Sequence, residues 1–177
     1  MRIVKKLLIG LLALVAMLIV VGMFLPREVA VERSIVIDAP ASKVYPHVSN
    51  LQATIAWSPW LGQDPETKLT FNNVVAGVGA VMEWASDNPN VGVGRMEIVE
   101  ATENKDMRVA LDFGEMGNAN ASWQFNQAGG QTTVTWCMVA DMGAGPVGRW
   151  MGLMMDDWVG ADYERGLQNL KTLVEGE

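Results

Sequence analysis

The sequence predicts an α+β fold: a curved antiparallel sheet of about seven strands wrapped around a long C-terminal helix, preceded by one transmembrane helix. Three observations predict it. The run 7–25 carries no charged or strongly polar side chain. Residues 67–139 form apolar stretches that alternate with polar positions and are separated by turn residues at regular spacing. Residues 147–174 repeat apolar side chains at spacings of three to five, roughly one face of a helix.

The apolar run is long enough to cross a membrane. As a helix rising about 1.5 Å per residue, Leu7–Leu25 nearly matches a hydrocarbon core of about 30 Å. A cleaved signal peptide is the alternative, but such peptides have apolar parts of only about 7–15 residues followed by an A-x-A-like site. Residues 20–25 offer no such site. We therefore expect an uncleaved anchor over residues 1–26 and one domain over residues 27–177.

Basic residues predict the orientation of this helix. Arg2, Lys5 and Lys6 precede it, whereas Arg27 follows it and is offset by Glu28. Because basic loops favour the cytoplasmic side, the N-terminus is expected in the cytoplasm. We predict a bacterial inner-membrane protein that crosses the membrane once and holds its domain in the periplasm.

The chain beyond the apolar run is acidic, with ten Lys and Arg against twenty Asp and Glu from Pro26 onward. Nucleic-acid binding depends on basic side chains that neutralise phosphates, so we exclude nucleic acid as a partner. The single cysteine, Cys137, allows no intramolecular disulfide, and with one histidine it makes no zinc-type ligand cluster. Cys137 is expected to be a buried, unreactive thiol on a strand. We predict no metal and no cofactor, and the sequence does not identify a protein partner.

Turn residues divide the domain into elements. Residues 29–38 alternate as a first strand, and Pro40 begins a short helix over residues 41–50. A second short helix or irregular turn is expected over residues 51–60. Six further strands are expected near residues 67–72, 79–85, 92–100, 105–113, 118–126 and 131–139.

The period of two assigns the strand side chains to a polar and an apolar face. The apolar face is predicted to hold Met82, Trp84, Met96, Ile98, Met107, Val109, Leu111, Phe113, Ala119, Ala121, Trp123, Phe125, Val134, Trp136 and Met138. The C-terminal helix should cover this face with Val147, Met151, Met154, Trp158, Tyr163, Leu167, Leu170 and Val174.

Short motifs follow the same order along residues 29–173. They are Val31–Pro40, Trp57-Ser-Pro-Trp60 with Asp64-Pro65, Leu111–Gly114, Thr132–Trp136, Gly148–Asp156 and Asp162–Lys171. In this order the motifs and elements resemble the START/Bet v 1-like (SRPBCC) superfamily and, within it, the polyketide cyclase/dehydrase-like proteins. The resemblance implies a helix-grip fold that encloses a hydrophobic molecule between sheet and helix. It does not select one activity, because members include binders, cyclases and partner-binding modules.

Twelve Met and seven Trp would suit a variable hydrophobic ligand, since Met adapts to irregular shapes and Trp offers flat contact. We predict an internal pocket whose ligand-binding residues are Trp84, Met96, Phe113, Trp123, Trp136, Met151, Met154 and Trp158. An ordinary filled core made of the same residues is the alternative. The segment 57–60 is expected to be a packed turn, with a lip at the pocket mouth as the alternative.

No catalytic residue is predicted. His47 is expected at the surface without a nucleophile beside it, and Asp112, Asp157 and Asp162 fall on solvent-facing positions, whereas Asp156 can face either way. The sequence therefore favours membrane-tethered binding or transport of a lipid-like or aromatic small molecule, without catalysis. A polyketide cyclase or dehydratase and a protein-interaction module of the cell envelope are the alternatives.

Overall fold

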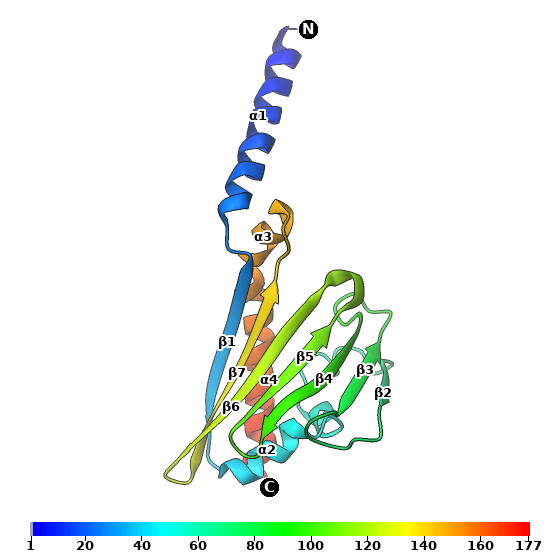
Figure 1. Ribbon diagram of the computed structural model, residues 1–177, viewed down its shortest axis with the longest axis vertical. Helices are drawn as coiled ribbons and strands as arrows, with labels where there is room; N and C mark the ends of the chain where they lie inside the picture. The colour runs from blue at the N-terminus through cyan, green and yellow to red at the C-terminus, as the bar shows by residue number, and fades with distance from the viewer. Residues whose placement is uncertain (1) are drawn as a thin grey trace.

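A computed structural model describes residues 2–177, in which the apolar helix α1 (Arg2–Phe24) extends away from a sheet-and-helix domain (Figure 1). The domain begins with β1 (Glu28–Ile37), α2 (Ala41–Ser49) and the short 3-10 helix η1 (Ala53–Ala56). Its other strands are β2 (Lys68–Phe71), β3 (Val81–Ala85), β4 (Val93–Thr102), β5 (Asp106–Asp112), β6 (Asn118–Ala128) and β7 (Gln131–Asp141). A second 3-10 turn, η2 (Gly114–Met116), joins β5 to β6, and α3 (Pro146–Gly152) and α4 (Met155–Glu175) complete the chain.

Helix α1 is exposed along almost its whole length, and in its most apolar window only 6% of the residues are buried. Its length and composition would allow it to cross a membrane, and a signal sequence would have the same properties. The expected N-terminal apolar helix is therefore present.

The seven strands form one antiparallel sheet in the order β1-β7-β6-β5-β4-β3-β2. Strands β2 to β7 follow one another as a meander, and β1 joins its edge by pairing along β7 from Glu28 opposite Asp141 to Ile37 opposite Thr132. Gly129 and Gly130 make the tight β6–β7 turn with φ of 59° and 88°, a left-handed conformation that favours glycine. The predicted α+β class with about seven strands is confirmed.

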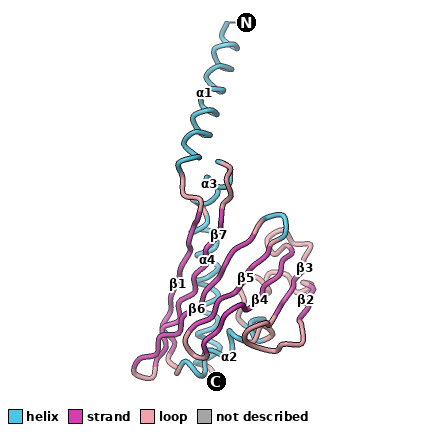
Figure 2. The backbone as a smooth tube through the Cα atoms, viewed as in Figure 1, coloured by secondary structure: helices cyan, strands magenta, loops and turns pink. Residues whose placement is uncertain are grey.

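Helix α4 lies along one face of the sheet and packs against β1 (Figures 1 and 2). The apolar rows predicted for β3 to β7 face this side and are buried or half-buried, while their polar neighbours face water. Helix α2 and the segment that follows it cover the sheet beside the C-terminal half of α4. The core is therefore enclosed by the sheet, α4 and α2.

The C-terminal segment differs from the prediction because it is two helices, separated at Leu153 and Met154. The inward row of α4 consists of Met155, Val159, Tyr163, Leu167, Leu170 and Val174. These positions are three or four residues apart, as one helical face requires. The apolar spacing in the sequence instead predicts Trp158 on this face, although Trp158 lies five residues before Tyr163, which is about 140° beyond a full helical turn.

The predicted interior position of Met151, Met154 and Trp158 is consequently wrong. Their side chains are 49%, 42% and 51% exposed. The break between α3 and α4 interrupts the helical row, so Met151 belongs to a different helix from Tyr163. Within α4, the side chains that face the interior before Tyr163 are Val159 and Met155, which precede it by four and eight residues.

Candidate ligand-binding interior

A cluster of aromatic rings occupies the middle of the interior, with Trp136 of β7 at its centre. Its ring stacks on Trp123 with 4.3 Å between centroids and on Tyr163 of α4 with 3.7 Å. Trp57 and Trp60 approach the same ring edge-on at 5.8 and 5.7 Å. Stacked and edge-on pairs are the favourable aromatic geometries, so this cluster joins the sheet firmly to α4.

The segment 57–60 is held by hydrogen bonds as well as by this packing. The indole nitrogen of Trp57, a residue only 3% exposed, donates to the carbonyl oxygen of His47 at 2.9 Å. The indole nitrogen of Trp60 donates to a carboxylate oxygen of Asp162, also at 2.9 Å. The segment 57–60 thus forms the expected packed turn, in which Trp57 is buried and Trp60 is half-buried. Asp162, which the sequence predicts to face solvent, is half-buried.

One end of the interior, which we call the closed end, is densely packed. It lies beside α2 and the C-terminal half of α4, where almost no side-chain surface reaches water. Its members are 0–1% exposed: Ile37, Val44, Val48, Ile98, Met107, Val134, Leu167 and Leu170. Such burial leaves little freedom for a guest molecule.

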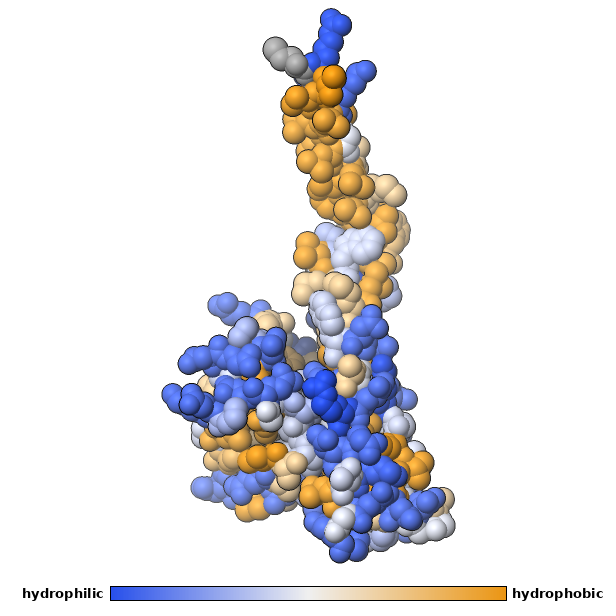
Figure 3. All heavy atoms as spheres, turned by 180° about the vertical axis from the view of Figure 1, so that it is seen from behind, coloured by the Kyte–Doolittle hydropathy of each residue, from blue (hydrophilic) through white to orange (hydrophobic). Residues whose placement is uncertain are grey.

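The other end, which we call the open end, lies toward α3 and is lined by smaller and more exposed side chains. Along β6 the inward row runs Phe125, Trp123, Ala121, Ala119, and along β7 it runs Trp136, Met138, Ala140. Half-buried apolar side chains surround these alanines: Trp84, Met96, Leu111, Phe113, Met142, Met155 and Val159. Figure 3 shows a recess between the sheet lobe and the column formed by α1 and α3. Toward α3 the side chains of the interior therefore become smaller, and several become half-buried.

The predicted ligand-binding residues divide into three groups. Trp123 and Trp136 belong to the buried cluster, and Trp84, Met96 and Phe113 line the open end. Met151, Met154 and Trp158 lie on the outer surface. Five of the eight thus share one interior, and whether they bind a ligand stays a prediction.

Sequence reasoning missed several residues of the open end as candidate site residues. Ala119 and Ala121 were predicted on the correct face of the sheet but not as site residues. Along this face of β6 the side chains change from the large ring of Phe125 to the small methyl groups of the two alanines, and such a change is a signal of room for a ligand. Met155 and Val159 were missed because the helical row was not traced backward in steps of four from Tyr163.

Two polar groups lie inside the apolar cluster. The indole nitrogen of Trp136 is buried without a hydrogen-bond partner, a situation that costs about 1–3 kcal/mol. The phenol of Tyr163 is 2% exposed, and burial raises its pKa far above the usual value, so the hydroxyl stays neutral. Both groups can donate a hydrogen bond to an acceptor oxygen.

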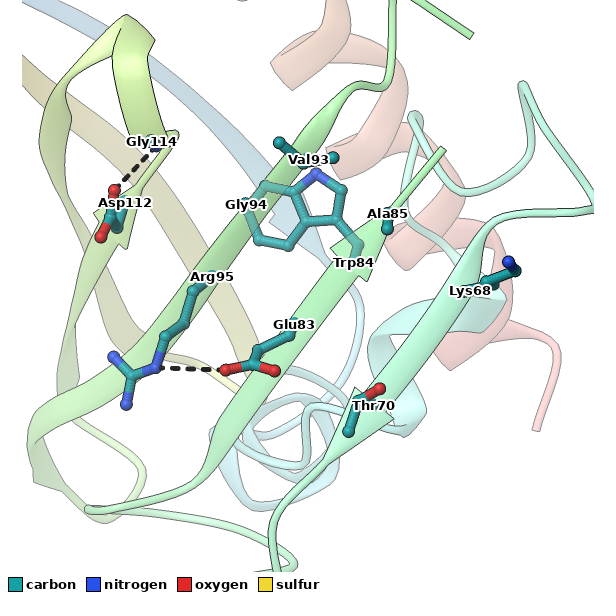
Figure 4. A pocket seen from close by; sticks show the side chains of 10 residues that line it. All are labelled: Lys68, Thr70, Glu83, Trp84, Ala85, Val93, Gly94, Arg95, Asp112 and Gly114. Atoms are coloured by element: carbon teal, nitrogen blue, oxygen red, sulfur yellow. Dashed lines mark hydrogen bonds and ion pairs between the residues drawn. The ribbon is translucent and has the colours of Figure 1, made fainter. Parts of the chain in front are cut away.

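A separate groove of about 470 Å³ lies on the outer face of the sheet across β2 to β5 (Figure 4). Charged side chains line it, including Lys68, Glu83, Arg95 and Asp112. Arg95 pairs with Glu83 at 3.8 Å and with Glu97 at 2.7 Å. Trp84, Ala85 and Val93 also line this open groove, so it combines charged with apolar side chains.

The single cysteine and histidine lie outside the interior row. Cys137 faces the outer side of the sheet and is half-buried, whereas the sequence predicts a buried thiol. Partial burial, and after it the nearby Glu32 carboxylate, raises the pKa of the Cys137 thiol. A raised thiol pKa is expected for an unreactive cysteine. The side chain of His47 is 19% exposed, less than the sequence predicted, and its Nε2 lies 3.4 Å from the Glu177 carboxylate. Asp156 is exposed and accepts a hydrogen bond from Arg33.

Residues 28–175 match the family described as polyketide cyclase/dehydrase and lipid transport. The chain belongs to this family. Its fold is the Bet v 1-like SRPBCC fold, whose members typically bind hydrophobic ligands. No curated protein gave a significant match.

Solved structures agree with this fold at low sequence identity. A protein from Chromobacterium violaceum is 15% identical with a TM-score of 0.60, covering 82% of this chain and 96% of its own. The Aha1 dimer from Colwellia psychrerythraea is 17% identical with a TM-score of 0.57, covering 83% and 96%. The di-domain ARO/CYC protein StfQ of the steffimycin pathway is 12% identical with a TM-score of 0.63, covering 84% and 51%. At these identities the likeness shows the fold alone.

Proposed function

We propose that this family member is a membrane-tethered, noncatalytic protein that binds or carries a lipid-like or aromatic small molecule between the sheet and α4. The observation that carries the proposal is the change in packing along the interior. The side chains of the closed end are almost completely buried, whereas the open end is lined by alanines and half-buried apolar side chains. That open end is also the end from which α1 emerges (Figure 1).

The exposed apolar helix supports the tether. Its side chains, such as Leu8, Leu12 and Ile19, are each at least half exposed, which is unfavourable in water and favourable in lipid. The basic residues before the span favour a cytoplasmic N-terminus and a periplasmic domain at a bacterial inner membrane. A tether here would keep the open end within reach of molecules that partition into the bilayer.

The lining suggests which molecules would fit. The walls are almost wholly apolar, and Trp136 offers an unpartnered N–H in their midst. A mainly hydrophobic guest with one acceptor oxygen, such as a carbonyl or ester, would satisfy that donor and recover its desolvation cost.

Filling the open end tests binding directly. Ala119 faces inward between Leu111 and Ala140, and Asn120 faces outward from the same strand. Ala119→Phe should remove small molecules that co-purify with the detergent-extracted full chain, quantified by mass spectrometry after organic extraction. Asn120→Phe, which adds the same ring to the outer face, should leave them unchanged.

Stability separates this proposal from a filled core. If the open end holds space, Ala119→Phe should change the melting temperature little. A large fall in melting temperature would show that no space exists, and an unchanged amount of bound molecule in a folded variant would show that the ligand lies elsewhere. Either result contradicts the proposal.

An enzymatic role of the cyclase or dehydratase type is the second candidate, and Tyr163 is the observation that favours it. Its neutral hydroxyl lies within the apolar interior, where it can donate a hydrogen bond that polarises a bound carbonyl. If the molecule recovered from the parent protein is chemically converted by it, and Tyr163→Phe binds the molecule without converting it, the noncatalytic proposal is wrong.

A further inference from the structure

Helix α3 packs against α1 as well as against Val29 and Met142 at the end of the sheet. The indole nitrogen of Trp150 donates to the carbonyl oxygen of Leu18 at 3.0 Å. Gly22 lies directly against Pro146 and Trp150, and a Cβ at this position would come within 2.8 Å of both side chains. Lack of a side chain at Gly22 therefore lets the two helices touch.

The position of this contact along α1 is informative. Leu18 precedes Leu25, the last residue of the apolar run, by seven residues, which is about 10 Å along a helix. If Leu7–Leu25 spans the hydrocarbon core, the indole of Trp150 lies well inside its outer boundary. Amphipathic helices at membrane surfaces are buried to about 5–10 Å, a similar depth.

The surface around α3 fits such a position. Its exposed apolar side chains are Val147, Met151, Leu153, Met154 and Trp158, of which Val147 is 72% exposed. A hollow of about 300 Å³ between α1 and α3 is lined only by Val15, Leu18, Ile19, Pro146, Val147 and Trp150. In water this hollow would be unfavourable, whereas a lipid acyl chain would fill it.

Charged groups mark where the lipid would end. The guanidinium of Arg149 donates to the carbonyl oxygens of Met23 and Leu25, at 2.5 and 3.2 Å, and so satisfies backbone acceptors at the end of α1. Arg27 and Asp141 form an ion pair immediately beyond them. Apolar side chains therefore lie on the α1 side of this level and ion pairs on the domain side.

We infer that α3 is embedded in the outer leaflet, so that the open end of the interior is held against lipid. This inference rests on the proposed membrane anchor. Helix α3 is expected to contact the hydrocarbon of the lipid rather than anionic headgroups. The domain is strongly acidic, and Asp156 and Asp157 follow α3 closely, so both would be repelled by anionic headgroups.

Spin labels on the full chain in phosphatidylcholine vesicles test the inference. The native cysteine is first removed by Cys137→Ser, so that each variant carries one label. The three variants carry the label at Val147→Cys in α3, at Leu11→Cys in the middle of α1, or at Val75→Cys. Val75 is a matched valine, 63% exposed, in the loop between β2 and β3 at the closed end. Accessibility to oxygen, which concentrates in lipid, is compared with accessibility to a water-soluble nickel complex.

We expect the ratio of oxygen to nickel accessibility to be severalfold higher at Val147→Cys than at Val75→Cys, and highest at Leu11→Cys. Equal ratios at Val147→Cys and Val75→Cys, with a lipid-exposed Leu11→Cys, would overturn the α3 inference and leave the anchor intact. A label at Leu11→Cys that remains exposed to nickel would refute the anchor, and the α3 inference with it.

Discussion

The two ends of the interior are built from the same strands and the same helix, yet they are packed in different ways. On β5, Met107 is completely buried at the closed end, whereas Phe113, just beyond the strand, is only half-buried at the open end. On α4, Leu170 is completely buried and Met155 is half-buried. If the closed end supplies most of the stability of the fold, as its complete burial predicts, the open end is the part that can accommodate a molecule under the proposed function.

Different forces hold the two ends. The closed end combines complete apolar burial with polar contacts such as that of His47 with Glu177, whereas at the open end ion pairs connect elements whose apolar side chains are half-buried. Arg27 joins Asp141 across β1 and β7, and Arg33 of β1 joins Asp156 and Glu164 of α4 at 2.9 and 2.7 Å. Exposed ion pairs contribute little individually, so the open end should open more readily than the closed end.

Truncating one leucine at each end should give the largest contrast. Leu170→Ala removes a completely buried side chain and should lower the free energy of unfolding by about 2–5 kcal/mol. Leu111→Ala, the same change at the half-buried open end, should cost less than half as much. Chemical denaturation of the detergent-solubilised chain measures both, and equal losses would remove the distinction between the ends.

Adding one methyl group at the open end should give an intermediate effect. A Cβ at Gly94 would collide with the ring of Trp84 and lie within 2.8 Å of the carbonyl oxygen of Asp112. Gly94→Ala should therefore displace Trp84 and destabilise the chain by about 1–3 kcal/mol. The control Gly62→Ala meets no atom within 4 Å. Denaturation and tryptophan fluorescence check this, and an unperturbed spectrum would show that the ring is not confined.

Acid should produce the smallest effect, which can be followed at Asp141 of the open end. The hydrogen bond from Arg27, followed by that from the Gly143 amide, lowers the pKa of Asp141 from 3.8 to about 2. Because the folded-state pKa is the lower one, the stabilisation is complete above pH 3.8 and disappears as the pH falls through about 2.

The matched comparison is with Asp141→Asn. The variant should melt slightly below the parent at neutral pH, and the gap should close as the pH falls from about 4 to 2, the interval between the two pKa values. A gap that persists at pH 2 would show that Asp141 acts through packing rather than through its charge.

The open end also shows how far sequence reasoning reaches into the site. Trp84, Met96 and Phe113 were found because strand side chains alternate strictly, which makes a face predictable from local spacing alone. The helical part was not found, because Met151 and Met154 depended on a single uninterrupted helix. The break at residues 153–154 carries no proline, and it is not evident from the local sequence.

The sequence by itself determined the seven alternating strands, their turns, the apolar N-terminal helix and the faces on which Trp123 and Trp136 lie. These features depend on the local period of the chain and on residues such as Gly129 that permit particular turns. Only the tertiary structure decided where the interior is completely buried and where it is half-buried, and that α3 joins α1 through Trp150. Those features arise from contacts between residues far apart in the chain, such as Trp150 with Leu18 and Trp136 with Tyr163, whose packing no local pattern encodes.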